Sequence, residues 1–165
     1  MHISPLEEYG LRCAAQLAKT HPSGQIAASR VAELEGLSTE YASKILFLFK
    51  KAGLIKATRG ARGGFKLSKD PTEIPLKDVF AALQQKKQFE GDFCNQFRGK
   101  KTECVHVSDC SIRPIWKILY TYLDTLFTNL TVADLIRPEG VATQKTIEIA
   151  LPMPMEKSDE TQDFA

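Results

Sequence analysis

The fold is decided by residues 28–68, which read ASRVAELEGLSTEYASKILFLFKKAGLIKATRGARGGFKLS. Two short helices are predicted here, because Gly36 is suited to end the first and Ser38 to cap the second. The second helix carries apolar residues at helical spacing and ends before Gly53. Two short helices joined by so tight a turn are typical of a helix-turn-helix.

A basic hairpin is predicted directly after this helix pair. Residues 54–58 and 65–68 have the composition of short strands, and the sequence RGARGG at 59–64 forms a glycine-rich hairpin tip between them. A helix-turn-helix followed by a hairpin is the order of a winged helix. The predicted fold class is therefore mainly α, a winged helix-turn-helix with a two-stranded wing.

Helices are also predicted on both sides of this unit. The first begins with Ser4 as its cap, Pro5 in the first turn and Glu7 closing a capping box. Another begins at Pro75, and a long one begins at about Arg113. The long helix has a heptad-like apolar stripe that is typical of dimerisation helices. The stripe consists of Ile112, Ile115, Trp116, Leu119, Tyr122, Leu123, Leu126 and Leu130.

These patterns divide the chain into four parts. We expect a winged-helix DNA-binding domain over residues 1–84 and a cysteine-bearing loop over 85–112. A dimerisation helix region is expected over 113–136, including a short helix that starts at Thr131. Residues 137–165 are expected to form a disordered tail, because the end of the chain, residues 152–165, contains two prolines and several acidic residues.

The charge of the chain is segregated, which points to a polyanionic partner. Residues 38–69 contain eight lysines and arginines against one glutamate, a net charge of +7 within a chain whose total is +2. Such asymmetry is expected where one face meets nucleic acid, although a solvated basic surface would have the same composition. The candidate DNA contacts are Thr39, Tyr41, Ser43, Lys44 and Lys50 of the second short helix, with Arg59 and Arg62 of the wing tip.

Each of these contacts has a simpler interpretation when taken alone. Lys50 could lie on the solvated end of a helix, Tyr41 could be a core residue, and the wing tip could be only a flexible turn. The ordered combination of helix pair and basic hairpin is more specific than any single residue. Polar groups on the outer face of a helix suit base edges and phosphates, and arginine on a narrow hairpin suits a minor groove.

Composition excludes several other classes of protein. The chain is 43% hydrophobic and 25% charged, which is ordinary for a globular protein that builds its own core. No apolar run reaches the roughly 18 residues of a membrane helix, and no secretory signal is evident, so a cytoplasmic location without membrane contact is expected. No catalytic motif stands out, so the chain is not expected to be an enzyme.

Three cysteines, Cys94, Cys104 and Cys110, lie within 17 residues of the predicted loop. Their thiolates could hold an iron–sulfur cluster, because soft sulfur binds iron well. Zinc is an alternative, with His106 as the fourth ligand, and a reversible disulfide without metal is another. Cys13 lies on the apolar face of the first helix and is expected to be a core residue.

Several short motifs resemble the Rrf-type winged-helix regulators, a family that includes iron–sulfur cluster regulators and nitric-oxide-sensing repressors. The resemblance covers about residues 1–136. Besides the order of elements and the trailing cysteine loop, it rests on YGLR at 9–12, Leu37-Ser38 leading to Tyr41, Gly53-Leu54, Arg59-Gly60 and Gly63-Gly64.

This resemblance implies a homodimer, held by the long helix, that binds a palindrome-like site in double-stranded DNA. It also implies a 2Fe–2S or 4Fe–4S cluster on the three cysteines, whose state sets DNA affinity. In some members an acidic residue from the first helix of the partner subunit is the fourth ligand, and Glu8 occupies that position here. The chain departs from the family in the nine-residue gap between Cys94 and Cys104, where five is common. It also has Arg113 where some members have a histidine ligand.

Overall fold

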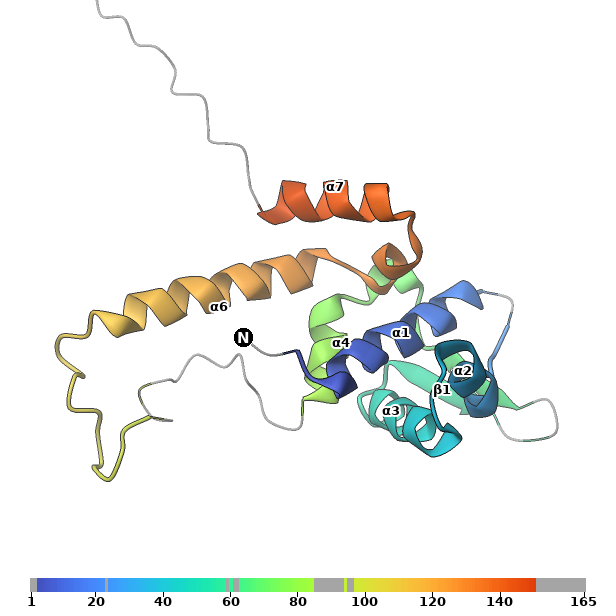
Figure 1. The fold of residues 1–165 in the computed structure, drawn as a ribbon, viewed down its shortest axis with the longest axis horizontal. Coiled ribbons are helices and arrows are strands. Elements are labelled where there is room, and N and C mark those ends of the chain that lie inside the picture. Colours follow the sequence, from blue (N-terminus) through green and yellow to red (C-terminus); the bar gives the residue numbers. More distant parts are fainter. Residues whose placement is uncertain are drawn as a thin grey trace, which may run out of the picture.

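The structure is a computed structural model that describes residues 3–22, 24–58, 60, 63–84, 94 and 97–150. The described residues are mainly helical, with one two-stranded antiparallel sheet. This confirms the predicted winged helix-turn-helix (Figure 1). The elements are α1 (Pro5–Lys19), α2 (Ala28–Glu35), α3 (Thr39–Lys51), β1 (Ile55–Thr58), β2 (Gly64–Leu67), η1 (Pro71–Glu73), α4 (Leu76–Leu83), α6 (Ile112–Asn129), η2 (Val132–Ile136) and α7 (Glu139–Ala150).

Local signals in the sequence set the helix boundaries. The Ser4 hydroxyl accepts a hydrogen bond from the Glu7 amide, and the Glu7 carboxylate accepts one in return from the Ser4 amide, which completes the predicted capping box. Gly36 ends α2 in the left-handed conformation, with φ of 66°. Ser38 then caps α3 by accepting a hydrogen bond from the Tyr41 amide.

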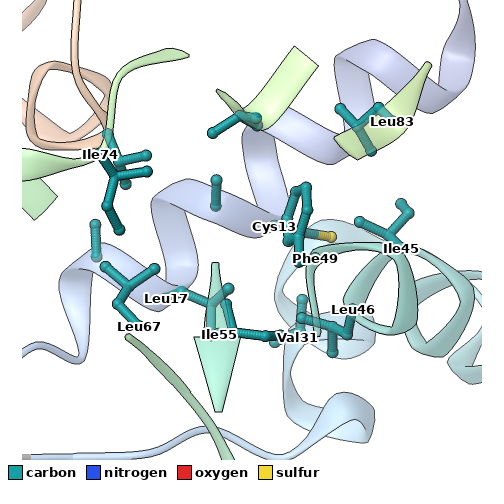
Figure 2. Packing of buried hydrophobic residues seen from close by; sticks show 14 of the residues in the cluster. Cys13, Leu17, Val31, Ile45, Leu46, Phe49, Ile55, Leu67, Ile74 and Leu83 are labelled. Carbon is teal, nitrogen blue, oxygen red and sulfur yellow. The ribbon is translucent and has the colours of Figure 1, made fainter. Parts of the chain in front are cut away.

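The core lies where α1, α2, α3, α4 and the wing meet (Figure 2). Leu17, Ile45 and Phe49 are almost fully buried there, and Cys13 is one of their neighbours. Burial, together with the nearby carboxylate of Glu35, raises the pKa of the Cys13 thiol to about 12. Cys13 is therefore a neutral core residue, as the sequence indicates.

Helices α1 and α4 pack closely against each other at Gly10. A Cβ atom added to Gly10 would lie 2.4 Å from Cδ1 of Leu83, which is itself buried. We therefore expect Gly10→Ala to destabilise the fold by about 1–3 kcal/mol, because a packed core must shift to admit the methyl group. Chemical denaturation followed by circular dichroism measures this change.

Gly140→Ala in α7 is the matched control, because nothing lies within 4 Å of a Cβ atom at that position. Alanine is the better helix former by up to about 1 kcal/mol, so the control is expected to be neutral or slightly stabilising. Equal effects of the two substitutions would contradict the close α1–α4 packing.

The long helix α6 is fixed at its C-terminal end and extends away from the winged helix (Figure 1). The ring centroids of Phe127 and of Phe80 in α4 are 4.3 Å apart, and the Lys77 ammonium nitrogen is 2.6 Å from an oxygen of the Asp124 carboxylate. The predicted apolar stripe is therefore divided. Its C-terminal part packs on the same protomer, whereas the part from Ile112 to Tyr122 is largely exposed.

The prediction of a disordered tail over residues 137–165 was wrong for its first part. Glu139–Ala150 form the helix α7, which contacts α6 (Figure 1). The prolines and most of the acids that indicated disorder lie beyond Ala150, in residues 151–165, which are outside the described part of the chain. Residues 139–150 contain good helix formers, and tertiary contacts stabilise the helix.

A buried ion pair supplies one of those contacts. The Asp134 carboxylate, with only 4% of its side chain exposed, accepts a hydrogen bond from the Lys145 ammonium of α7 and lies 3.0 Å from Arg137 Nε. Burial alone would raise the pKa of Asp134, but hydrogen bonds from Lys145 and Thr131 outweigh burial and lower it. The carboxylate therefore stays charged and connects α7 to η2.

Candidate functional site

Helix α3 presents a mainly polar face to solvent, which includes three lysines, one acid (Glu40) and one phenylalanine (Phe47). Four of the candidate DNA contacts, Thr39, Ser43, Lys44 and Lys50, are exposed on it. The opposite face is anchored in the core by Ile45, Leu46 and Phe49. This arrangement leaves hydroxyl and ammonium groups free to meet the edges of bases in a groove.

Tyr41, the fifth candidate on this helix, is only partly exposed. Its ring packs edge-on against Tyr9 of α1, with ring centroids 6.0 Å apart. The Tyr9 ring also lies close to the Arg12 guanidinium, whose central carbon is 5.6 Å from the ring centroid. Tyr41 therefore helps to fix α3 against α1, as the core interpretation proposed. Any DNA contact by Tyr41 stays a prediction.

The wing carries a pair of exposed lysines that the sequence analysis did not single out. In the register of the hairpin, Lys56 of β1 is directly opposite Lys66 of β2, and both are exposed. Like charges opposite each other in a sheet are destabilising, so the pair is better explained by a surface that meets an anion. Strand alternation in the sequence could have identified these positions, because Ile55 and Leu67 beside them are buried.

The wing is held rigidly at its base. Ile26 forms a bridge with Phe65 through two backbone hydrogen bonds of 2.9 and 2.8 Å. Next to this bridge, a Cβ atom on Gly64 would lie 2.9 Å from the Ile26 carbonyl oxygen. The two backbone segments therefore lie closer together than a side chain at position 64 would allow. The tip residues Arg59 and Arg62 lie outside the described residues.

The cysteine loop is attached to the start of α6 by Arg113. Its guanidinium donates hydrogen bonds to the carbonyl oxygens of His106 and Val107, at 3.2 and 2.7 Å. Its backbone amide donates to the Cys110 sulfur at 3.4 Å. The position at which some Rrf-type regulators have a histidine ligand is thus used here to hold the loop.

The structure does not bring the predicted ligands together. Cys94, Cys104 and Cys110 are free and partly exposed. Among the residues that the structure describes, no three histidine, cysteine or acidic side chains form a group that could hold a metal. Glu8 lies on the exposed side of α1, with Oε1 3.5 Å from Nε of Arg12. The donor chemistry fits an iron–sulfur cluster, but this loop conformation does not.

Comparison with known proteins identifies the family. The family model described as "Rrf2: Iron-dependent Transcriptional regulator" matches residues 3–138, which include the winged helix, the cysteine loop and α6. This chain belongs to the Rrf2 family. It is accordingly a DNA-binding transcription regulator and not an enzyme.

Individual Rrf2 proteins support this assignment over most of the chain. Protein Rrf2 of Nitratidesulfovibrio vulgaris is 28% identical over 155 residues, which cover 91% of this chain and 97% of the relative. The structure of T. potens IscR is similar with a TM-score of 0.64 and 25% identity, over 82% of this chain and 86% of that one. The structure of B. subtilis CymR, titled a global cysteine regulator, has a TM-score of 0.65 and 26% identity, over 82% and 96%.

Within the described residues of this Rrf2 protein, no helix combines the length and apolar character needed to cross a bilayer. The N-terminal part of α6 carries an exposed apolar surface, where Ile112, Ile115 and Ile118 are each more than half exposed.

Proposed function

We propose that this Rrf2 regulator binds double-stranded DNA as a homodimer, with α3 in the major groove and the wing against the phosphate backbone. The observation that carries the proposal is the set of exposed lysines on α3 and on the wing, where Lys56 and Lys66 are directly opposite each other. Thr39, Ser43, Lys44 and Lys50 are the candidate groove contacts of α3, and by sequence Arg59 and Arg62 are the proposed contacts of the wing tip.

The lysine pair of the wing makes a measurable prediction. Lys56→Ala with Lys66→Ala is expected to weaken binding to all DNA sequences and to reduce the slope of log affinity against log salt by about 4, because the dimer loses four lysines and each phosphate contact releases about one counterion. Fluorescence anisotropy with a labelled duplex over a range of salt concentrations measures the slope.

The matched control removes two adjacent exposed lysines from the cysteine loop, Lys100→Ala with Lys101→Ala. The net charge changes equally, so a specific role of the wing requires the control to keep the wild-type slope. If both double variants lose the same amount, the effect reflects only overall charge and the proposed interface is wrong.

We infer that the dimer forms through α6. Its exposed isoleucines, together with Leu119 and Tyr122, form an apolar surface that the described part of the protomer leaves uncovered. We infer that a second copy of α6 covers this surface, because the apolar stripe has the heptad-like spacing of a helix–helix interface. Two recognition helices would then meet half-sites about one turn of DNA apart.

We further propose that DNA affinity depends on an iron–sulfur cluster, 2Fe–2S or 4Fe–4S, held by Cys94, Cys104 and Cys110. Support comes from three free thiols on one loop and from the iron dependence named for the family. The loop must close for the thiols to meet, because the described residues do not gather them. Glu8 of the partner subunit is the proposed fourth ligand, since this side chain is exposed on α1.

A further inference from the structure

The recognition helix α3 exposes one large apolar side chain that packing does not explain. Phe47 is 63% exposed, whereas Ile45, Leu46 and Phe49 of the same helix are at most 1% exposed. The apolar residues through which α3 packs into the core therefore do not include Phe47. Because burial in the core does not account for the position of this ring, the charged residues around it bear on its role.

The neighbours of Phe47 place it in the middle of the proposed DNA-facing surface. Residues three and four positions apart share one face of a helix, and those positions are occupied by Ser43, Lys44, Lys50 and Lys51. All four are exposed. The phenyl ring thus projects from a surface whose charges are complementary to a phosphate backbone, which identifies DNA as its partner.

The major groove offers one apolar feature to such a ring. Among the groups that bases display there, the C5-methyl group of thymine is apolar, whereas the others are hydrogen-bond donors and acceptors. We propose that Phe47 reads thymine in the operator by packing its ring on this methyl group. The inference rests on the proposed insertion of α3 in the major groove, and it adds a specificity for thymine that the basic residues cannot supply.

The expected size of the effect follows from burial of one methyl group. Removing the thymine methyl costs about fourfold in affinity at one half-site, the equivalent of about 0.8 kcal/mol. A dimer on a symmetric site makes the contact twice, so the total loss is expected to be roughly 15-fold. A loss of this size is easily resolved by anisotropy.

The experiment is a double-mutant cycle between protein and DNA. A duplex is selected from a random library with the full-length wild-type protein, and each symmetric pair of its thymines is replaced in turn by deoxyuridine, which lacks only the methyl group. Affinities are measured for the wild type, Phe47→Ala and Phe47→Leu. We expect one pair of positions at which the wild type loses roughly 15-fold, Phe47→Ala loses nothing and Phe47→Leu, which keeps an apolar side chain, loses an intermediate amount.

Phe97→Ala is the matched control, because Phe97 is a similarly exposed phenylalanine outside α3. It should retain the full wild-type discrimination. Equal wild-type affinity for the thymine and uracil duplexes at every position would overturn the inference while leaving DNA binding intact. Discrimination that persists in Phe47→Ala would also overturn it, since another residue would then read the methyl group. Absence of salt-dependent DNA binding by the wild type would overturn both this inference and the proposed function.

Discussion

Ile115→Glu combined with Leu119→Glu is expected to make the protein monomeric and to lower its affinity for a palindromic duplex by at least about a hundredfold. Both side chains lie on the exposed stripe of α6, and Ile115 is 64% exposed in the protomer. The substitutions therefore cost the isolated fold little. In the dimer they place four carboxylates in an apolar seam, where burying an unpaired charge is strongly unfavourable. A monomer meets only one half-site, so the advantage of linked binding is lost.

Light scattering at micromolar concentration measures the oligomeric state, and anisotropy measures the affinity. Leu34→Glu is the control for the oligomeric state, because Leu34 is an exposed leucine on α2, away from α6. This control is expected to remain dimeric. A dimer that survives the α6 substitutions, or a wild type that is itself monomeric, would show that α6 is not the interface.

Serine in place of Cys94 or Cys110 is expected to abolish the visible absorption of anaerobically purified protein. A hydroxyl group is a poor replacement for a soft thiolate ligand of iron, so the loss should be nearly complete. The cluster-loaded wild type should also differ from the cluster-free protein in DNA affinity, whereas the serine variants should show one affinity under both conditions. Cys104→Ser is expected to act in the same direction.

Two controls separate ligation from general damage. Cys13→Ala removes the buried thiol and should keep the absorption spectrum, because that side chain lies in the core. Glu8→Ala should alter the spectrum if Glu8 is the fourth ligand, whereas Glu33→Ala, which removes another exposed glutamate, should not. Stoichiometric zinc without iron would contradict the cluster, and so would a metal-free protein whose cysteines form a reversible disulfide.

Much of the winged helix could be predicted from the sequence because its signals are local. A glycine with positive φ at Gly36, a serine cap at Ser38 and the capping box at Ser4 each act within a single turn of chain. The glycine-rich hairpin likewise carries its own turn chemistry. These signals depend little on distant residues, and the structure has the capping box, the left-handed glycine and the serine cap where they were predicted.

Features that depend on distant contacts were predicted less well. The helix α7 requires the buried pair of Lys145 with Asp134, which no periodicity reveals. Phe47 was not among the predicted DNA contacts, because only its exposure in the folded structure distinguishes it from its apolar neighbours in the sequence. The convergence that we propose for the three cysteines depends on the cluster itself and on a second protomer, neither of which is encoded in local spacing.

Because α6 is attached to α4 near its C-terminal end, a movement of its N-terminal end would rotate the helix about this attachment. The part of α6 between the cysteine loop and its contacts with α4, at Asp124 and Phe127, is an arm about 20 Å long. On such an arm, a displacement of about 5 Å at the end next to Cys110 corresponds to a rotation of only about 15° about these contacts. A large movement of the surface loop would therefore correspond to only a small tilt of the winged helix, which contains α3. The two recognition helices of a dimer must match the pitch of DNA, so a tilt of that size would change how well they fit their half-sites.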